Sequence, residues 1–487
     1  MDSPGATVHL RSSTGRAVVL ATVLGSALAM LDATVVNIAL PRIGEDLGAS
    51  VAGLQWVLSG YTLTLASLIL LAGALGDRLG RRKVFVWGTV WFALASALCG
   101  LAPTIELLVA ARVLQGVGAA LLTPGSLALL SATIDPDDRG AAIGLWSGLG
   151  GVASAAGPLL GGWIVEVSSW RAVFWLNLPL AAAVVWVAVR HVPESRDPHQ
   201  QGRLDLPGAV LAALALAALT YGLIAGHWVA VVAGAALLLA FVLVELRTDN
   251  PLVPPSLFRS RVFAAANLVT LAVYAALGGV FFLLVLQLQL GAGFTPLASG
   301  LATLPITVLM LLLSARAGRF AQHRGPRLPM SVGPLIAAAG LLLMLRIGPG
   351  ASYLRDVLPG VVVFGLGLSA LVAPLTGAVL GSVSTDRAGI ASGVNNAVAR
   401  SSQLLAVAAL PGLAGIAGTN YTDPQVFSHG FRVAMLICVG LLVIGAAIAA
   451  ALIPAGAPAE EPRDSIECKS RCDISGPAVA PVRERSS

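Results

Sequence analysis

Apolar residues in this chain run in long, uninterrupted segments. The first extends from Ala17 to Leu40, AVVLATVLGSALAMLDATVVNIAL, and Pro41 and Arg42 close it. About 20 consecutive apolar residues are enough to cross the hydrocarbon core of a bilayer as a helix. The segment is too long for the apolar part of a signal peptide and has no cleavage signature after it. It is therefore predicted to be the first membrane-spanning helix.

Fourteen such segments follow one another along the chain. They cover about residues 17–40, 52–73, 84–101, 105–133, 141–164, 171–189, 206–225, 228–246, 262–290, 296–315, 328–346, 357–380, 388–416 and 431–453. The 487 residues are 57% hydrophobic and 11% charged, whereas about 25% of the residues of a soluble protein are charged. We therefore predict an all-α integral membrane protein with fourteen transmembrane helices.

The basic residues predict the orientation of these helices. If the N-terminus is cytoplasmic, the inside loops and tails hold 23 of the 30 Lys and Arg residues and the outside loops hold five. Two more, Arg112 and Arg400, lie within predicted helices. Lys and Arg are enriched in cytoplasmic loops. Both termini are therefore predicted to be cytoplasmic. The excess of Arg over Lys indicates a high-GC genome, and we expect the inner (plasma) membrane of a bacterium.

A repeated loop divides the chain into two halves. The segment 73–82, GALGDRLGRR, follows the second predicted helix, and 318–327, GRFAQHRGPR, follows the tenth, with the shared glycines and last arginine 245 positions apart. Both copies start on the same side, as in transporters that are built from parallel repeats. The expected organisation is a cytoplasmic N-tail 1–16, six-helix bundles 17–190 and 262–453, cytoplasmic linkers 191–261 with two inserted peripheral helices at about 206–246, and a disordered cytoplasmic tail 454–487.

Several classes of protein are disfavoured by the residues that the chain lacks. Neither lysine, Lys83 or Lys469, stands in the Gly-Lys-Ser/Thr of a P-loop, which excludes an ATPase of that type. No cluster of His, Cys or acidic residues falls within the predicted helices, so we expect no metal site and no enzyme. Cys468 and Cys472 have no nearby histidine and make an incomplete zinc site. We expect them to belong to an unstructured tail, and we expect no nucleotide or nucleic acid as a partner.

Four motifs resemble those of the major facilitator superfamily. GDRLGRRK at 76–83 resembles its loop signature, and LDATVVNIALP at 31–41 resembles the first-helix motif of its 14-helix drug:proton antiporter branch. ARVLQGVGAA at 111–120 is similar to the fourth-helix motif with a buried arginine, and GPLLGG at 157–162 to the fifth-helix antiporter motif. The similarity extends from about residue 17 to 453. The second loop departs from the pattern, because Gln322 stands where the first has Asp77.

The resemblance implies a function. It implies a proton-coupled antiporter that exports small, mostly hydrophobic organic compounds such as drugs or antibiotics by alternating access. Such a protein needs no cofactor beyond the proton-motive force, and we expect it to work as a monomer in the bilayer. The alternatives are an exporter of an endogenous metabolite, lipid or siderophore, a proton-coupled importer, which GPLLGG disfavours, and a membrane enzyme or scaffold.

Two charges lie deep in the predicted membrane region. Inserting a charged side chain costs at least about 2.5 kcal/mol, so such a residue usually has a function. At 1.5 Å per residue, Asp32 lies ~13 Å from Pro41 and Arg112 ~12 Å from the outer end of its helix. We predict that Asp32 couples transport to protons and that Arg112 is its counter-charge. The alternative is a static ion pair that fixes helix packing. Gln115 either orients the guanidinium or makes an interhelical hydrogen bond.

The loop after the second helix is predicted to act as a gate. Its glycines permit a tight turn, and Asp77 can pair with nearby arginines. The resemblance suggests that Asp77 instead faces the positive end of the helix that begins near Ala388 and latches the outward-facing state. For the basic residues, the alternative is that they only mark the cytoplasmic side of the membrane. The proposed gating residues are Gly73, Gly76, Asp77, Arg78, Gly80, Arg81, Arg82 and Arg139.

The remaining candidates concern the fifth helix and the substrate cavity. Small residues let helices approach closely, and proline kinks a helix. The fifth predicted helix has both, at Gly157, Pro158, Gly161 and Gly162. These residues are either the antiporter element that the resemblance implies or a site of ordinary tight packing. Asn396, Arg400 and Gln403 share one face of a helix and either bind substrate or seal the two halves. Gln55, Trp56 and Tyr61 either stack a ring of the substrate or hold the interface. Further cavity candidates are Asn37, Gln115 and, more weakly, Gln287.

Overall fold

The computed structural model describes residues 8–196, 205–249, 251–384, 387–418 and 420–456. Across these ranges the chain is helical apart from turns and one isolated β-bridge between Val8 and Ile134. Thirteen helical segments are long and apolar enough to cross a membrane. The remaining predicted crossing, 388–416, is helical over Ala388–Leu413. Polar side chains interrupt the apolar sequence of this helix. The predicted all-α membrane architecture is confirmed.

The helices are as follows. The first half contains α1 (Ser13–Leu47), α2 (Val51–Leu79), α3 (Arg81–Leu101), α4 (Ile105–Thr133), α5 (Pro136–Val167), α6 (Trp170–Trp175) and α7 (Asn177–His191). The inserted pair is α8 (Leu206–Ala225) and α9 (Trp228–Glu245). The second half contains α10 (Arg261–Leu286), α11 (Pro296–Arg324), α12 (Arg327–Met344), α13 (Leu358–Leu380), α14 (Ala388–Leu413) and α15 (Pro424–Leu452). Short turns of 3-10 or π-helix occupy Pro255–Arg259, Gln287–Gly291, Tyr353–Val357 and Asn420–Thr422.

Several helix boundaries differ from the predicted ones, and two of these differences bear on the ion-pair helices and their neighbours. Helix α1 does not end at Pro41 but continues to Leu47, where Gly48 with φ of 60° ends it. Proline is tolerated inside membrane helices because neighbouring elements satisfy the freed backbone groups. The sixth predicted crossing is divided at Leu176 into α6 and α7. Asp32 therefore lies near the middle of α1, and the helix extends beyond Pro41.

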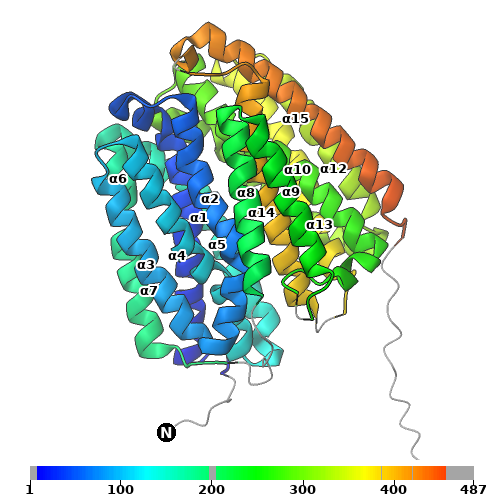
Figure 1. The fold of residues 1–487 in the computed structure, drawn as a ribbon. Coiled ribbons are helices and arrows are strands. Elements are labelled where there is room, and N and C mark those ends of the chain that lie inside the picture. The colour runs from blue at the N-terminus through cyan, green and yellow to red at the C-terminus, as the bar shows by residue number, and fades with distance from the viewer. Residues whose placement is uncertain (1–7, 197–204, 250, 385–386, 419, 457–487) are drawn as a thin grey trace, which may run out of the picture.

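The repeat is visible in the two loops that carry it. Helices α2 and α3 are joined through Gly80, which has φ of 113°, and α11 is followed by Gly325, which has φ of 88°. Both conformations strongly favour glycine. The same tight connection therefore occurs once in each half, as the spacing of 245 residues predicted, and Figure 1 shows the two halves side by side.

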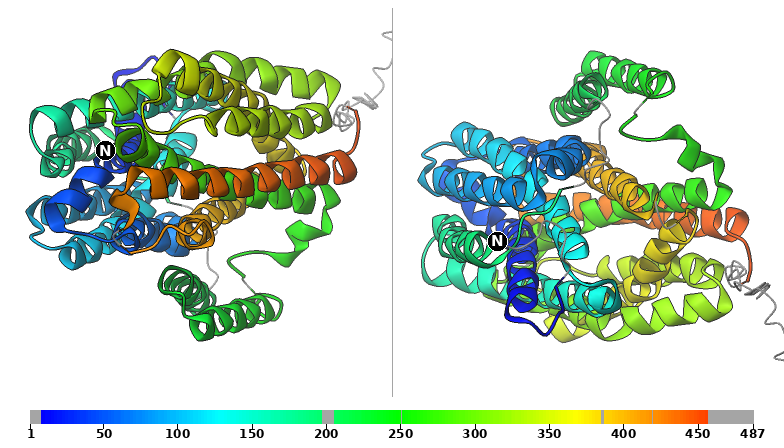
Figure 2. Two further views of the ribbon diagram at one scale, coloured as in Figure 1. Left: turned by 90° about the horizontal axis from the view of Figure 1, so that it is seen from above. Right: turned by 90° about the horizontal axis from the view of Figure 1, so that it is seen from below.

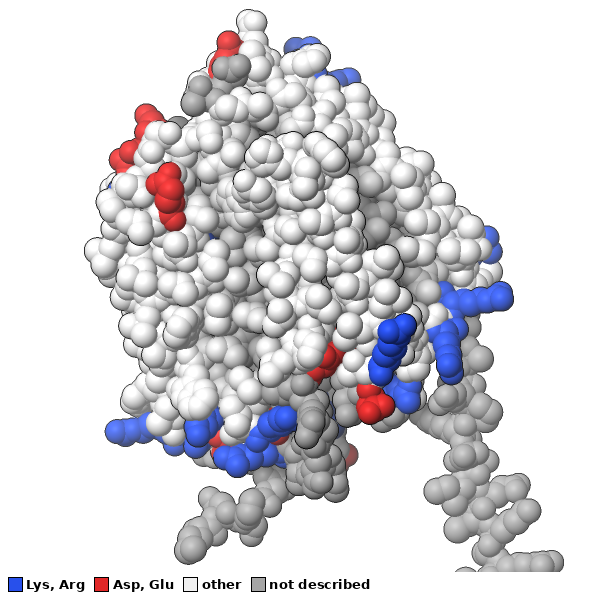
Figure 3. All heavy atoms as spheres, viewed as in Figure 1, with Lys and Arg blue, Asp and Glu red and all other residues white. Residues whose placement is uncertain are grey.

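One end of the molecule is rich in basic residues, and we call it the basic end. It holds the connections α2–α3 and α11–α12, the start of α5 and the end of α7. On the face in Figure 3, Lys and Arg gather along this end, and a broad belt without charges separates it from the other end. The described chain begins and ends at the basic end (Figure 1). The belt suits a protein that spans a bilayer.

The two halves are joined at the end opposite the basic end. Within the described residues, every hydrogen bond between the halves lies there. The pairs are Asn37–Phe281, Gln289–Ile38, Gln55–Val407, Gln55–Ala408, Tyr421–Ala49, Val51–Gly418 and Leu297–Glu166. By contrast, no atom lies within 4 Å of a Cβ built on Gly140, Gly144 or Gly148, in the basic-end part of α5. The conformation is therefore closed opposite the basic end.

The inserted helices α8 and α9 form a hairpin at one side of the bundle (Figure 2). Helix α8 packs on both α2 and α14. Buried Ala66, Leu216 and Leu404, one from each of these helices, form a small cluster of their own. In α9, Gly234 and Glu245 are the residues that are buried. The hairpin is thus peripheral, but α8 contacts both halves of the protein.

Candidate functional site

The central feature of the first half is an ion pair between α1 and α4. Nη1 of Arg112 lies 2.6 Å from Oδ2 of Asp32. Asp32 is 2% exposed and Arg112 is 0% exposed. The two predicted intramembrane charges therefore meet in the core of the first half. A charge pair at this depth is stable only where further polar groups satisfy it.

Two amide side chains supply those groups. Gln115 donates to Oδ1 of Asp32 at 2.8 Å and accepts from Nη1 of Arg112 at 2.6 Å. Asn177, on α7, donates to the same carboxylate oxygen at 2.9 Å. Both amides also reach Oγ of Ser96 on α3, at 2.7 Å and 3.2 Å. Gln115 thus orients the guanidinium and also bonds to another helix, so both predicted alternatives hold.

The sequence reasoning missed Asn177 and Ser96. Asn177 is the one amide in the apolar sequence WLNLPL and is buried. A buried amide in a membrane segment needs a hydrogen-bond partner, and this was the signal that it offered. Ser96 has no comparable signal, because serines and other small residues are common throughout these helices.

Arg112 also contacts helix α2. Its Nε donates to the carbonyl oxygen of Val57 at 3.1 Å, and its guanidinium carbon lies 4.3 Å from the centre of the Tyr61 ring. Such a cation–π contact is stronger where both groups are desolvated. Nη2 of Arg112 is buried and has no hydrogen-bond partner among the described residues. The guanidinium therefore has spare donor capacity next to Tyr61.

Glycines in α4 bring the helices of the site together. A Cβ on Gly116 would collide with Tyr61 and Thr64 of α2, and one on Gly118 would collide with the backbone of Phe92 on α3. Thr64 uses the close approach to donate to the carbonyl oxygen of Val113 at 2.9 Å. Small residues at such contacts permit tight helix packing in a membrane. This spacing lets α2 and α3 reach the ion pair.

The predicted gating loop is held by contacts within the first half. Asp77 pairs with Arg81 at 2.8 Å. The backbone N–H of Arg82 donates to Oε1 of Glu194 at 3.0 Å, and its guanidinium donates to the carbonyl oxygen of Val192 at 3.0 Å. A Cβ on Gly80 would collide with the Glu194 carboxylate. Glu194 follows α7 and was not predicted to belong to the loop.

The proposed latch is not formed in this conformation. Among the described residues the Asp77 carboxylate bonds to Arg81, not to the start of α14. Arg78 and Arg139 are partly buried at the same end, and Nε of each has no partner within the described chain. Gly73 and Gly76 lie in the last turns of α2. The pairing of Asp77 with an arginine of its own loop is the alternative that the sequence left open.

The fifth-helix motif packs against both halves. Gly157 and Gly161 face Thr34 and Val35 of α1. Gly162 faces the backbone of Leu297 at the start of α11, and the carbonyl oxygen of Pro158 meets Gly300 of the same helix. The motif therefore forms part of the closed contact opposite the basic end.

The cavity candidates have different surroundings in the structure. The side chains of Asn37 and Gln55 bond across the halves, while Gln287 bonds to Ile347 and Ser428 inside the second half. Gln115 and Tyr61 belong to the ion-pair site. The other candidates, Trp56, Asn396, Arg400 and Gln403, are exposed or half-buried. The structure thus brings Asn396, Arg400 and Gln403 to one accessible stretch of α14 and assigns packing contacts to Gln287.

The described residues contain no group of three or more His, Cys, Asp or Glu that could hold a metal ion. Cys99 and Cys438 are buried and free. Cys468 and Cys472, considered above as an incomplete zinc site, lie outside the described residues.

Comparisons with known proteins agree with these features. The model of the Major Facilitator Superfamily matches residues 22–407. A puromycin resistance protein of Streptomyces alboniger is 35% identical over 90% of this chain and 91% of its own length. The tetracenomycin C resistance and export protein of Streptomyces glaucescens is 36% identical over 81% of this chain and 75% of its own length.

Solved structures share the fold. A D-xylose–proton symporter superposes with a TM-score of 0.65 and 15% identity, covering 91% of this chain and 98% of its own. A peptide transporter in complex with sulfate superposes with a TM-score of 0.67 and 14% identity, covering 91% of this chain and 97% of its own.

Proposed function

The chain belongs to the major facilitator superfamily, and from this we propose that it exports small, mostly hydrophobic organic compounds such as antibiotics in exchange for protons. Its relatives are resistance and export proteins for puromycin and tetracenomycin C, which supports a drug as the cargo. The buried pair of Asp32 and Arg112 is the observation that carries the proposal of proton coupling.

The ion pair suits a proton carrier because a change in the charge of Asp32 changes its contacts with Arg112 and the two amides. As a carboxylate, Asp32 accepts three hydrogen bonds, from Arg112, Gln115 and Asn177. A proton on Asp32 removes its charge and weakens the contact with Arg112. Arg112 then holds an uncompensated charge beside Tyr61 of α2. Helix α2 packs on α14, and its Gln55 bonds to Val407 of that helix. Protonation of Asp32 thereby acts on a helix that contacts α14, which offers polar groups to the cargo.

Export requires the site to open alternately to each side. By the positive-inside rule the basic end faces the cytoplasm of a bacterial cell, so the described conformation is the inward-facing one. In this state the cargo enters from the cytoplasm between the halves and meets Asn396, Arg400 and Gln403. In the outward-facing state Asp77 leaves Arg81 and latches the start of α14.

Transport in vesicles tests this function. The wild-type protein, reconstituted with its basic end outside, is expected to accumulate a labelled antibiotic when the vesicle interior is acidified. Asp32→Asn is expected to lose this accumulation while still binding the compound. An Asp32→Asn protein that transports at the wild-type rate with unchanged pH dependence would refute the assignment of Asp32.

A further inference from the structure

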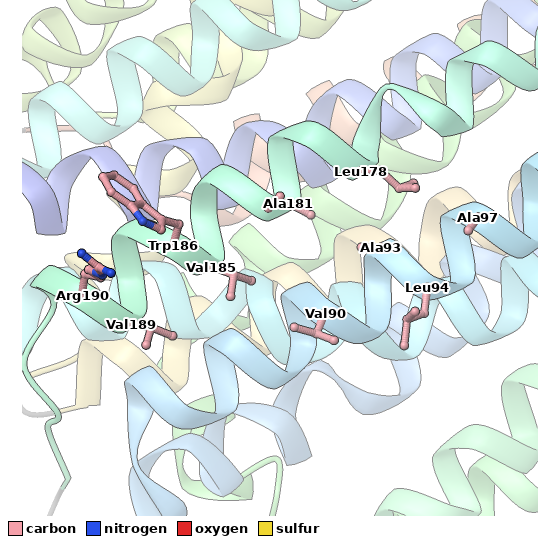
Figure 4. A pocket seen from close by; sticks show the side chains of 11 residues that line it. Val90, Ala93, Leu94, Ala97, Leu178, Ala181, Val185, Trp186, Val189 and Arg190 are labelled. Atoms are coloured by element: carbon pink, nitrogen blue, oxygen red, sulfur yellow. The ribbon is translucent and has the colours of Figure 1, made fainter.

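An apolar groove runs along the outer flank of the first half, between α3 and α7 (Figure 4). Its volume is about 550 Å³. The lining residues are Val90, Ala93, Leu94, Ala97, Leu178, Ala181, Ala182, Val185, Trp186, Val189 and Arg190. Helices α3 and α7 pack on helices of the first half, so the groove lies away from the interface between the halves.

The shape of the groove matches an extended hydrocarbon chain. Alanines from both helices leave the space open, and all its lining residues except Arg190 are apolar or aromatic. Along α7 it extends from Leu178 to Arg190, which is ~18 Å at 1.5 Å per residue. One leaflet of the hydrocarbon core is ~15 Å thick. The groove is therefore about as long as one acyl chain.

The charges of the groove lie at one end. Arg190 and Trp186 stand together at one end of the groove in Figure 4, and Leu178 and Ala97 at the other. Arg190 lies in the last turn of α7, at the basic end. Among the described residues its exposed guanidinium has neither an ion pair nor a hydrogen bond. Its positive charge is therefore available to a ligand.

A second cation, Lys83, lies on α3 in line with the residues that line the groove. Lys83 and Trp87 precede Val90 and Leu94 at spacings of four and three residues, which places them on one helical stripe. Nζ of Lys83 lies 4.9 Å from the centre of the Trp87 ring. Trp87 is 49% exposed and Trp186 is 58% exposed. Exposed tryptophans are typical of the level of lipid headgroups.

Glu194, the acidic residue that follows α7, is engaged by a different arginine. Its carboxylate is held by the backbone N–H of Arg82 and lies 3.8 Å from Nε of that residue. The groove thus combines an apolar channel of acyl-chain length with Arg190 at one end and, on the helical stripe that continues its α3 side, Lys83.

We propose that this groove binds an anionic phospholipid from the leaflet at the basic end. One acyl chain lies along the alanines of α3 and α7, and the phosphate contacts Arg190 and Lys83. Basic pockets between transmembrane helices on the cytoplasmic side are suited to anionic headgroups. A zwitterionic lipid fills the apolar part equally well but gains less from the two cations.

Lipid binding to the purified full-length protein tests the proposal without any transport assay, so its outcome is independent of the proposed export function. The protein is incorporated into nanodiscs of phosphatidylcholine with a small fraction of spin-labelled phosphatidylglycerol, and bound lipid is counted from the immobilised signal. Each basic residue near a membrane surface contributes about 1 kcal/mol to binding, which is about fivefold in affinity.

The variants separate the two parts of the site. Lys83→Gln/Arg190→Gln is expected to weaken phosphatidylglycerol binding by roughly 30-fold, since two such contributions multiply. Ala182→Trp, at an exposed position of the groove, is expected to weaken phosphatidylglycerol and phosphatidylcholine alike. The control Arg247→Gln removes an exposed cation from the inserted hairpin, away from the groove, and is expected to have no effect.

Three results would overturn the proposal. One is equal binding of phosphatidylglycerol and phosphatidylcholine by the wild type. Another is an equal loss of affinity with Arg247→Gln and with the double variant. The third is displacement of the lipid from the groove by a second copy of the chain, seen as a dimer that Ala182→Trp abolishes.

Discussion

The carboxylate of Asp32 and the guanidinium of Arg112 lie 2.6 Å apart, and both residues are buried. They come from helices α1 and α4, 80 residues apart in the sequence. Each charge compensates the other in the buried core of the first half. The pair therefore links the packing of the first half to the protonation of a single carboxyl group.

The first prediction separates the structural and coupling roles of this pair. Asp32→Asn leaves Arg112 buried without a counter-charge, which is expected to cost about 3–5 kcal/mol in the free energy of unfolding. Asp32→Asn/Arg112→Gln removes both charges and is expected to regain most of the lost thermal stability. It is not expected to regain proton-driven accumulation in vesicles. If the double variant transports as the wild type does, the pair is purely structural.

The second prediction concerns Asn177, whose side chain donates to Asp32. Asn177→Ala removes one of the three donors that stabilise the carboxylate, so Asp32 binds a proton more readily. We expect the pH profile of efflux to shift to higher pH, with the rate at the optimum reduced less than tenfold. Asn267→Ala is the matched control, because Asn267 is a buried amide of α10 that bonds to Phe263 and Asn395. A similar shift in both variants would rule out a specific action on Asp32.

The third prediction uses two glycines of α5. A Cβ on Gly162 would lie 2.7 Å from the backbone of Leu297, whereas one on Gly148 would meet nothing within 4 Å. Overpacking typically costs 1–3 kcal/mol, so Gly162→Ala is expected to disfavour the conformation that is closed opposite the basic end. Gly148→Ala is expected to leave the conformational equilibrium unchanged.

Spin labels measure this equilibrium. Leu79 and Ile390 are exposed at the basic end, one in each half, and are replaced by cysteine in a protein whose tail cysteines are changed to serine. The distance between the labels is expected to shorten in Gly162→Ala, because closing the basic end accompanies opening of the other end. An unchanged distance distribution would contradict the assignment of the α5–α11 contact.

The fourth prediction concerns the latch. Asp77 pairs with Arg81 in the described conformation, and its proposed partner in the other state is the start of α14. Arg81→Gln frees the carboxylate, so we expect the label distance to shorten. Asp77→Asn removes the latch and is expected to lengthen it. If the two variants shift the distance in the same direction, Asp77 acts only through its contact with Arg81.

The fifth prediction concerns the inserted hairpin. Asp205 and Glu245 are buried, and each accepts a backbone N–H, from Gly208 and Val253. Their other oxygens, Oδ2 of Asp205 and Oε1 of Glu245, have no hydrogen-bond partner among the described residues, and both lie close enough to collide with a Cβ on Gly208. Two buried carboxylates this close repel each other, so we expect one of them to bind a proton in the folded protein. Both are ionised in the unfolded chain at neutral pH, so folding takes up a proton and stability falls as the pH rises.

Glu245→Gln replaces that proton with an amide donor. Its thermal stability is expected to exceed that of the wild type by about 1 kcal/mol at alkaline pH, and its dependence on pH is expected to be flatter. Thermal unfolding at mildly acidic and alkaline pH measures both effects. Asp249→Asn, at an exposed position just after α9, is the control. A parallel pH dependence in Glu245→Gln and the wild type would exclude a shared proton.

The sequence by itself determined the features that depend on neighbouring residues. Apolar runs long enough to cross a bilayer define the helices, because each crossing must satisfy its backbone hydrogen bonds internally. The repeated glycines determined the connections at Gly80 and Gly325, because a positive φ favours glycine. Counting residues along two helices also brought Asp32 and Arg112 to similar depths before any contact was known.

Only the tertiary structure decided which residues complete the site and which contacts hold the present conformation. Asn177 and Ser96 belong to the hydrogen-bond network around Asp32 because helices α3 and α7 pack beside α1 and α4. The sequence around either residue does not predict that packing. The sequence left open whether Asp77 pairs with an arginine of its own loop or with the start of α14, and the described conformation pairs it with Arg81. Likewise, the groove between α3 and α7 is lined by residues such as Val90 and Arg190 that are 100 positions apart, and it forms only because α3 and α7 are neighbours.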